Sequence, residues 1–289
     1  MSGDLTAMDV KTVAVLGAGT MGHGIAHAAM AAGYTTVLYD VSQAQLDKGK
    51  AAIDGVIQKG VELGKVVAAD ATAMRERLRL STVVADAVRD ADIVIEAAPE
   101  SIDLKLALFG AVEAAAPAHA VFASNTSALS ITEMAAVLTN PGRMGGMHFF
   151  NPVHRMKLVE VVKALDTTAE TIAVMEAVSA KMGKETVLVK ESPGFITTRI
   201  NAMIGNEAFY MLQDGVASAR DIDKGLKLGL NHPMGPFELV DLVGLDTRLS
   251  ILQYLHQMLG EKFRPCPLLE QHVRDGRLGR KVGKGVYDY

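Results

Sequence analysis

The chain has 289 residues, of which 49% are hydrophobic, 21% are charged and 9 are prolines. This length and composition are typical of a packed protein with about two domains, and they exclude disordered and fibrous classes. The formal net charge of -4 gives no electrostatic reason for a nucleic-acid partner, so none is expected.

The first two-thirds of the chain alternates short β-branched runs with segments of helical spacing. Strands are expected at 12 to 17, 35 to 40, 91 to 98, 120 to 125, 143 to 150, 157 to 162 and 185 to 190. Helices are expected at 42 to 65, 102 to 115 and 169 to 182. The alternation predicts βαβ units and an α/β fold with a doubly wound, mostly parallel sheet.

The remainder of the chain has a different character. Residues 194 to 276 contain few β-branched runs, and NHPMGP and RPCP interrupt them. They are expected to form several helices. The sequence therefore predicts two domains, a sheet-containing domain over residues 1 to 192 and a smaller all-helical C-terminal domain over residues 193 to 289.

Nothing in the sequence indicates a membrane, a disulfide or a metal. The first residues, MSGDLTAMDVK, lack the segments of a signal peptide, and no run approaches the length of a membrane span. Cys266 is the only cysteine, and no Cys/His cluster has metal-ligand spacing. A cytoplasmic protein without membrane contact, disulfide or metal is expected.

The stretch TVAVLGAGTMGHGIA joins a strand to a small-residue helix through a G-x-G-x-x-G motif. Gly17 suits a tight turn, Gly19 lets backbone approach a pyrophosphate, and Gly22 lets the helix pack on the strand. A second strand ends at Asp40, where a carboxylate accepts hydrogen bonds from ribose hydroxyls and repels a 2′-phosphate. An NAD site in a Rossmann-type domain is therefore predicted, formed by Gly17, Gly19, Thr20, Met21, Gly22 and Asp40. In an alternative interpretation, Asp40 only caps the helix starting near Ser42.

The stretch HFFNPVHRMKLVEVV places a histidine and a glutamate in two apolar runs. If these runs pair as antiparallel neighbours with the turn centred on His154, His148 and Glu160 are directly opposed at about 5 Å. A carboxylate at one imidazole nitrogen fixes the tautomer and leaves the other nitrogen to exchange a proton. With an NAD site, this pair predicts interconversion of an alcohol and a ketone.

These motifs together resemble the (S)-specific 3-hydroxyacyl-CoA dehydrogenase family, especially its short bacterial 3-hydroxybutyryl-CoA dehydrogenases. The resemblance spans residues 10 to 289 through GAGTMGHGIA, VIEAAPE, SNTSALSI, HFFNPVHRMKLVEVV, PGF, NHPMGPFELVDLVGLD and GRKVGKGVYDY. It implies an NAD-dependent oxidoreductase of fatty acid metabolism that interconverts 3-hydroxybutyryl-CoA and acetoacetyl-CoA. The HFFNP to KLVEV block is the most specific part.

Carried over by position, the resemblance implies that His148 is the general acid and base and Glu160 is its partner. It implies that Ser127 hydrogen-bonds the substrate; the alternative is a helix N-cap before ALSITEMAAVL. Glu100 and Lys105 resemble a pair that contacts the cofactor and the neighbouring substrate, and the alternative is a solvated pair at a helix start. Asn125 is expected near the nicotinamide ribose.

Substrate contacts are less readable. The family usually has PGFxxNR, whereas this chain reads PGFITTR and places Thr198 at the asparagine position. Asn201, one helical turn later, is expected on the same face and could partly replace the missing amide. Lys59 is the first candidate among the lysines of the helix after the second strand for binding the phosphates of CoA.

The resemblance also implies a homodimer formed through the helical C-terminal domain, which would contribute to the substrate cleft. Two other functions stay open. A family relative acting on a free hydroxy acid, such as an L-gulonate or carnitine dehydrogenase, would keep Gly17, Asp40 and His148 without a CoA grip. A non-catalytic NAD-binding protein, of the sort recruited as a lens crystallin, is the other alternative.

Overall fold

The computed structural model describes residues 10–289, and the chain divides into two compact units, one ending at Glu191 and one running from Ser192 to Tyr289. The expectation about a signal peptide concerns residues that lie mostly outside the described range.

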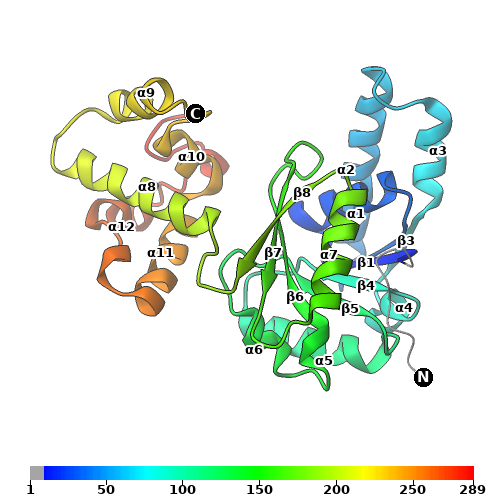
Figure 1. The fold of residues 1–289 in the computed structure, drawn as a ribbon. Helices are drawn as coiled ribbons and strands as arrows, with labels where there is room; N and C mark the ends of the chain where they lie inside the picture. The colour runs from blue at the N-terminus through cyan, green and yellow to red at the C-terminus, as the bar shows by residue number, and fades with distance from the viewer. Residues whose placement is uncertain (1–9) are drawn as a thin grey trace. The chain divides into compact units, whose positions relative to one another are not determined.

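The first unit is built on an eight-stranded sheet in the order β3-β2-β1-β4-β5-β6-β7-β8 (Figure 1). Its strands are β1 (Thr12–Leu16), β2 (Thr35–Tyr39), β3 (Leu78–Ser81), β4 (Ile93–Glu96), β5 (Val121–Ser124), β6 (Met144–Phe149), β7 (Leu158–Lys163) and β8 (Glu185–Lys190). Only β6 and β7 pair in antiparallel fashion. The predicted α/β class and mostly parallel sheet are confirmed, although β3 was not predicted.

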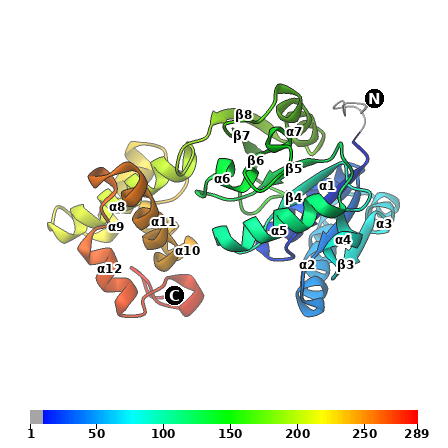
Figure 2. The same ribbon diagram turned by 90° about the horizontal axis from the view of Figure 1, so that it is seen from below.

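The helices of this unit lie on both faces of the sheet. They are α1 (Thr20–Ala31), α2 (Gln43–Glu62), α3 (Ala68–Glu76), α4 (Val84–Val88), α5 (Ile102–Ala115), α6 (Ile131–Ala135) and α7 (Ala169–Lys181). Helices α1, α2 and α7 contribute to the core on one face. Helices α4, α5 and α6 are neighbours on the other face (Figure 2).

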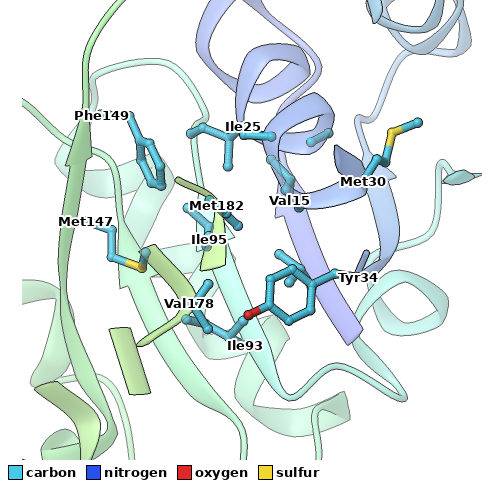
Figure 3. Packing of buried hydrophobic residues seen from close by; sticks show 14 of the residues in the cluster. Val15, Ile25, Met30, Tyr34, Ile93, Ile95, Met147, Phe149, Val178 and Met182 are labelled. Carbon is cyan, nitrogen blue, oxygen red and sulfur yellow. The ribbon is translucent and has the colours of Figure 1, made fainter. Parts of the chain in front are cut away.

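The strands are apolar on both faces because helices cover both faces. Val15, Ile93 and Ile95 point into the larger core, where Ile25 of α1 and Val178 of α7 meet them (Figure 3). Intervening residues such as Phe122 point to the opposite face, where Phe109 of α5 packs with a ring separation of 6.4 Å. This two-sided burial explains the nearly continuous apolar runs of the sequence.

The strand order changes direction at β1, which lies between β2 and β4. The chain leaves β1 toward β2 on one side, and β4 pairs with β1 on the other side. Such a reversal opens a crevice beyond the carboxyl ends of the strands, where open α/β sheets bind ligands. Strands β1, β4, β5 and β6 are parallel, so their carboxyl ends share this edge.

The second unit is helical, as predicted. It contains α8 (Thr197–Gln213), α9 (Ala219–Gly229), α10 (Pro236–Val243), α11 (Leu245–Leu259) and α12 (Pro267–Arg274), with short 3-10 turns at Glu261–Phe263 and Arg280–Val282. Phe209 and Phe237 pack edge to face at 5.2 Å in its core. Buried Asn206 links α8 to the segment that precedes α12. Its Nδ2 donates to Arg264 O and its Oδ1 accepts from Cys266 N, each at 2.8 Å.

Two buried aspartates hold the C-terminal tail against its own unit. Asp241 accepts from the backbone N–H groups of Val286 and Tyr287 and from the Tyr289 hydroxyl, at 2.8, 3.0 and 2.9 Å. Asp223 accepts from the Tyr287 hydroxyl at 2.7 Å. The GKGVYDY segment is therefore held against the second unit, where Val286 and Tyr287 pack on its core.

Within residues 10–289, no helix combines the length and hydropathy needed to cross a bilayer. In the same described range, no three His, Cys, Asp or Glu side chains are grouped in a way that could hold a metal ion.

Candidate active site

The glycine-rich loop after β1 is shaped by two close backbone approaches. Gly17 has φ +106°, and a Cβ atom there would lie 2.6 Å from the carbonyl oxygen of Ala97. A Cβ atom on Gly22 would lie 1.7 Å from the carbonyl oxygen of Gly17. Both positions therefore require glycine for the protein's own packing, as the motif predicted.

Gly19 is different because the protein itself leaves the space beside it open. Its φ of -68° is accessible to any residue, and an added Cβ atom would meet no protein atom within 4 Å. Gly19 precedes α1, whose first two residues are Thr20 and Met21. No side chain caps the first amides of this helix. An open surface at an uncapped helix N-terminus fits a dinucleotide pyrophosphate.

Asp40 connects the end of β2 to this loop. Its Oδ2 accepts from the backbone N–H of Ala18 at 2.9 Å, and its Oδ1 accepts from the N–H of Ser42 at 3.0 Å. The side chain of Ser42, not that of Asp40, caps α2 by accepting from Gln45 N. The alternative interpretation of Asp40 as the helix cap is therefore wrong, and its carboxylate is held beside the glycine loop.

His148 and Glu160 face each other across the β6–β7 pair, and the predicted antiparallel register is confirmed. His148 Nδ1 lies 2.6 Å from Glu160 Oε2, and Glu160 is fully buried. An ionised carboxylate only accepts, so Nδ1 carries its proton toward Glu160 and the neutral ring presents Nε2 as an acceptor. Ser127 Oγ lies 3.1 Å from that Nε2.

The segment after β5 carries Ser127 and is attached to β6 next to His148. Asn125 Oδ1 accepts from the backbone N–H of Phe149 at 2.8 Å.

The N-cap of α6 is Ser130, whose side chain accepts from Glu133 N at 3.1 Å. Ser127 therefore does not cap this helix, and the alternative interpretation of its hydroxyl is wrong.

Glu100 and Lys105 are joined, but Lys105 is not solvated. Lys105 is only 1% exposed, and its ammonium lies 2.5 Å from Glu96 Oε1 and 3.4 Å from Glu100 Oε2. Glu100 Oε1 accepts from the Thr126 hydroxyl and from the backbone N–H of Ser127, at 2.5 and 3.1 Å. The interpretation of a solvated pair is wrong for Lys105, whereas the Glu100 side chain is 45% exposed. A cofactor contact by either residue stays a prediction.

Sequence reasoning missed the buried polar group beneath these residues. Glu96 ends β4 with no exposed surface and accepts from the Ser124 hydroxyl at 2.5 Å and from Ala98 N at 2.7 Å. A glutamate ending the apolar run ADIVIE was an available signal, of the kind that identified Glu160.

The remaining predicted substrate residues lie on two helices, α2 and α8. Lys59 is exposed in the last turn of α2. Thr198 and Asn201 lie in α8 of the second unit, both partly buried. Their roles in substrate binding stay predictions.

Helix α1 also carries a partly buried histidine, His27, that lies close to other basic groups. Burial, and then the neighbouring His154, His23 and Lys184, lower the pKa of His27 to about 4. The ring of His27 packs edge to face on that of His154 at 6.3 Å, and its Nδ1 is buried without a hydrogen-bond partner. The folded state therefore disfavours the charged ring.

We expect this histidine to make the fold less stable in mild acid. In the unfolded chain His27 takes up a proton near its ordinary pKa of about 6.5, so stability is lost as the pH falls from about 6.5 to 4. His27→Gln, which cannot titrate, should weaken this dependence. Urea unfolding of both proteins at pH 7 and pH 5 measures it, and equal losses of stability would contradict the assignment.

Comparison with known proteins gives consistent matches over nearly all of the chain. A family model described as "3-hydroxyacyl-CoA dehydrogenase, NAD binding domain" matches residues 12–192, and one described as "3-hydroxyacyl-CoA dehydrogenase, C-terminal domain" matches residues 194–289. The chain is 44% identical to a probable 3-hydroxybutyryl-CoA dehydrogenase of Bacillus subtilis, with 98% of each chain covered. It is 44% identical to a 3-hydroxybutyryl-CoA dehydrogenase of Bradyrhizobium diazoefficiens, covering 97% of this chain and 96% of the relative. Among solved structures, it is similar to the (S)-3-hydroxybutyryl-CoA dehydrogenase of Ralstonia eutropha, with a TM-score of 0.93, 43% identity and coverage of 97% and 99%.

Proposed function

Because the chain belongs to the 3-hydroxyacyl-CoA dehydrogenase family, we propose that it interconverts (S)-3-hydroxybutyryl-CoA and acetoacetyl-CoA with NAD as its cofactor. The observation that carries this proposal is the line of contacts from Ser127 through His148 to buried Glu160. This line of contacts lies at the carboxyl ends of the parallel strands, where the glycine loop also lies.

In the oxidative direction, Nε2 of neutral His148 takes the proton of the substrate's 3-hydroxyl group. Glu160 stabilises the protonated ring through Nδ1, and it keeps the ring oriented in both protonation states. Ser127, at 3.1 Å from Nε2, orients the same substrate oxygen. In the reductive direction, protonated His148 returns the proton to the ketone oxygen.

The proposed NAD site is formed by the glycine loop and Asp40. NAD supplies the acceptor for the hydride that leaves C3 of the substrate. Gly17, Gly19, Thr20, Met21 and Gly22 provide the pyrophosphate surface, and the Asp40 carboxylate holds the ribose hydroxyls. Asp40 also disfavours a 2′-phosphate by charge repulsion, so NAD is preferred over NADP.

Other residues belong to the proposal as ligand contacts. Glu100 and Asn125 are proposed to meet the cofactor from the loops after β4 and β5. Lys59 is proposed for the phosphates of CoA, and Thr198 and Asn201 for the acyl portion.

We also infer a homodimer formed through the second unit and a cytoplasmic location. Several apolar side chains of the second unit are well exposed, including Val216 at 67%, Leu228 at 76% and Leu230 at 66%. A second copy of the chain would remove such surface from water. Light scattering coupled to size exclusion tests this inference, and a mass near 30.7 kDa, that of one chain, would contradict it.

The function is tested by initial rates of NADH oxidation with acetoacetyl-CoA beside free acetoacetate. We expect turnover of the thioester to exceed that of the free acid by far, and NADH to be used in preference to NADPH. Preference for the free acid would overturn the thioester substrate and favour a free hydroxy-acid dehydrogenase. Tight NADH binding without turnover of either compound would indicate a non-catalytic NAD-binding protein.

A further inference from the structure

Helix α5 directs a charged side chain into the protein and leaves an apolar one in solvent. Lys105 is 1% exposed and lies on the same face as buried Phe109 and Val112, four and seven positions later. Leu104, its neighbour in sequence, is 44% exposed. Apolar packing would favour the opposite arrangement. The position of Lys105 therefore satisfies a requirement other than burial of apolar surface.

The ammonium of Lys105 is enclosed by groups at the ends of β4 and its following loop. It donates to Glu96 Oε1 at 2.5 Å and to Ala98 O at 3.3 Å. Glu96 is paired in register with Ser124 of β5, whose hydroxyl donates to Glu96 Oε2 at 2.5 Å. A buried ion pair of this kind adds little net stability compared with apolar residues of similar volume.

Glu100 extends this network to the catalytic group. Its Oε2 lies 3.4 Å from the Lys105 ammonium, while its Oε1 accepts from the Thr126 hydroxyl and the Ser127 N–H. Thr126 N also donates to Ser124 Oγ at 3.2 Å. The backbone at Ser127 is thus held by a carboxylate whose other oxygen faces the buried ammonium.

We propose that Glu96 and Lys105 are positioning residues that fix the Glu100 carboxylate and, through it, the Ser127 hydroxyl against His148 Nε2. This proposal rests on the proposed function, in which Ser127 and His148 handle the same substrate oxygen. The contacts run from Glu96 to Lys105, then to Glu100, Ser127 and His148.

The double variant Glu96→Gln/Lys105→Met tests this role. It removes both buried charges at nearly constant shape, and the side-chain amide introduced at position 96 keeps an oxygen that accepts from Ser124 or Ala98. Replacing both partners of a buried pair is close to neutral for folding. Loss of the groups that orient metal ligands typically costs 10- to 100-fold in activity, and we expect a comparable fall in kcat with acetoacetyl-CoA when the groups that orient Ser127 are lost.

A matched control removes a carboxylate from the same helix. Glu113 of α5 accepts from Arg143 at 3.0 Å and from Thr139 N at 2.8 Å. These hydrogen bonds are remote from the network that contains Ser127. Glu113→Gln should keep the wild-type kcat. Thermal unfolding of both variants shows first that each is folded.

The effect of the double variant on kcat in a protein that lacks the Ser127 hydroxyl distinguishes positioning from a general structural effect. In a Ser127→Ala background, the double variant should cause no further loss of kcat, because the group that it positions is already absent. An equal loss in both backgrounds would show independent, structural effects and would overturn the proposal.

A spectroscopic readout keeps this test separate from that of the proposed function. With ¹⁵N-labelled histidine, the Nε2 resonance of His148 in the substrate-free protein should shift in the double variant and stay in place in Glu113→Gln. An unmoved resonance, or an unchanged kcat, would overturn the positioning role. Failure of the wild-type protein to reduce acetoacetyl-CoA would refute the proposed function but leave the resonance test intact.

Discussion

His148→Asn should lower kcat for reduction of acetoacetyl-CoA by NADH by about 10²- to 10⁴-fold, the range contributed by acid–base catalysis. Asparagine keeps an N–H donor near the position of Nδ1, so buried Glu160 still accepts a hydrogen bond from this side. It has no group that exchanges a proton at neutral pH. The loss should therefore appear in kcat, while the KM for NADH changes little. Steady-state kinetics at saturating NADH measures it.

Two companion variants define what the loss means. His148→Ala should show a similar kcat but unfold more readily, because it removes the imidazole donor from a buried carboxylate, that of Glu160. His154→Asn makes the same change at an exposed position in the turn between β6 and β7, and it should keep the wild-type kcat. If His148→Asn retained more than a tenth of the wild-type kcat, His148 would not be the acid and base.

The antiparallel pairing of β6 and β7 could be predicted because it depends on local pattern. Both strands are nearly continuous apolar runs, and a charged residue within such a run is conspicuous. Opposition of His148 and Glu160 follows from the turn between the strands, and the structure has this register. The glycine loop is similarly local, because a strand, a tight turn and a helix follow one another directly in sequence.

Contacts set by tertiary packing could not be predicted in this way. Glu96 is as conspicuous as Glu160, but its partner Lys105 comes from a helix, and a helical lysine is normally solvated. The orientation of α5 about its axis, which the structure gives, places Lys105 on the same buried face as Phe109 and Val112. The edge strand β3 escaped prediction for a related reason: Leu78–Ser81 is short and includes the exposed Arg79.

Gly19→Ala should bind NADH at least tenfold more weakly while unfolding at nearly the wild-type temperature. The protein has no internal need for glycine there, because φ is -68° and an added methyl group meets no protein atom within 4 Å. In the proposed complex, that space belongs to the pyrophosphate, and backbone must approach it closely. Replacing Gly by Ala also removes conformational freedom from the unfolded chain, which stabilises folding by about 0.4–1 kcal/mol where the conformation is compatible.

Gly22→Ala provides the contrast, since the same methyl group would lie 1.7 Å from the carbonyl oxygen of Gly17. The loop or α1 must move, so this variant should lose stability and cofactor affinity together. Thermal unfolding without ligand and NADH fluorescence titration give the two quantities independently. A Gly19→Ala protein with wild-type affinity for NADH would mean that the pyrophosphate does not lie beside Gly19. If both variants lost stability equally, Gly19 would serve the fold, and its open surroundings would not identify the cofactor surface.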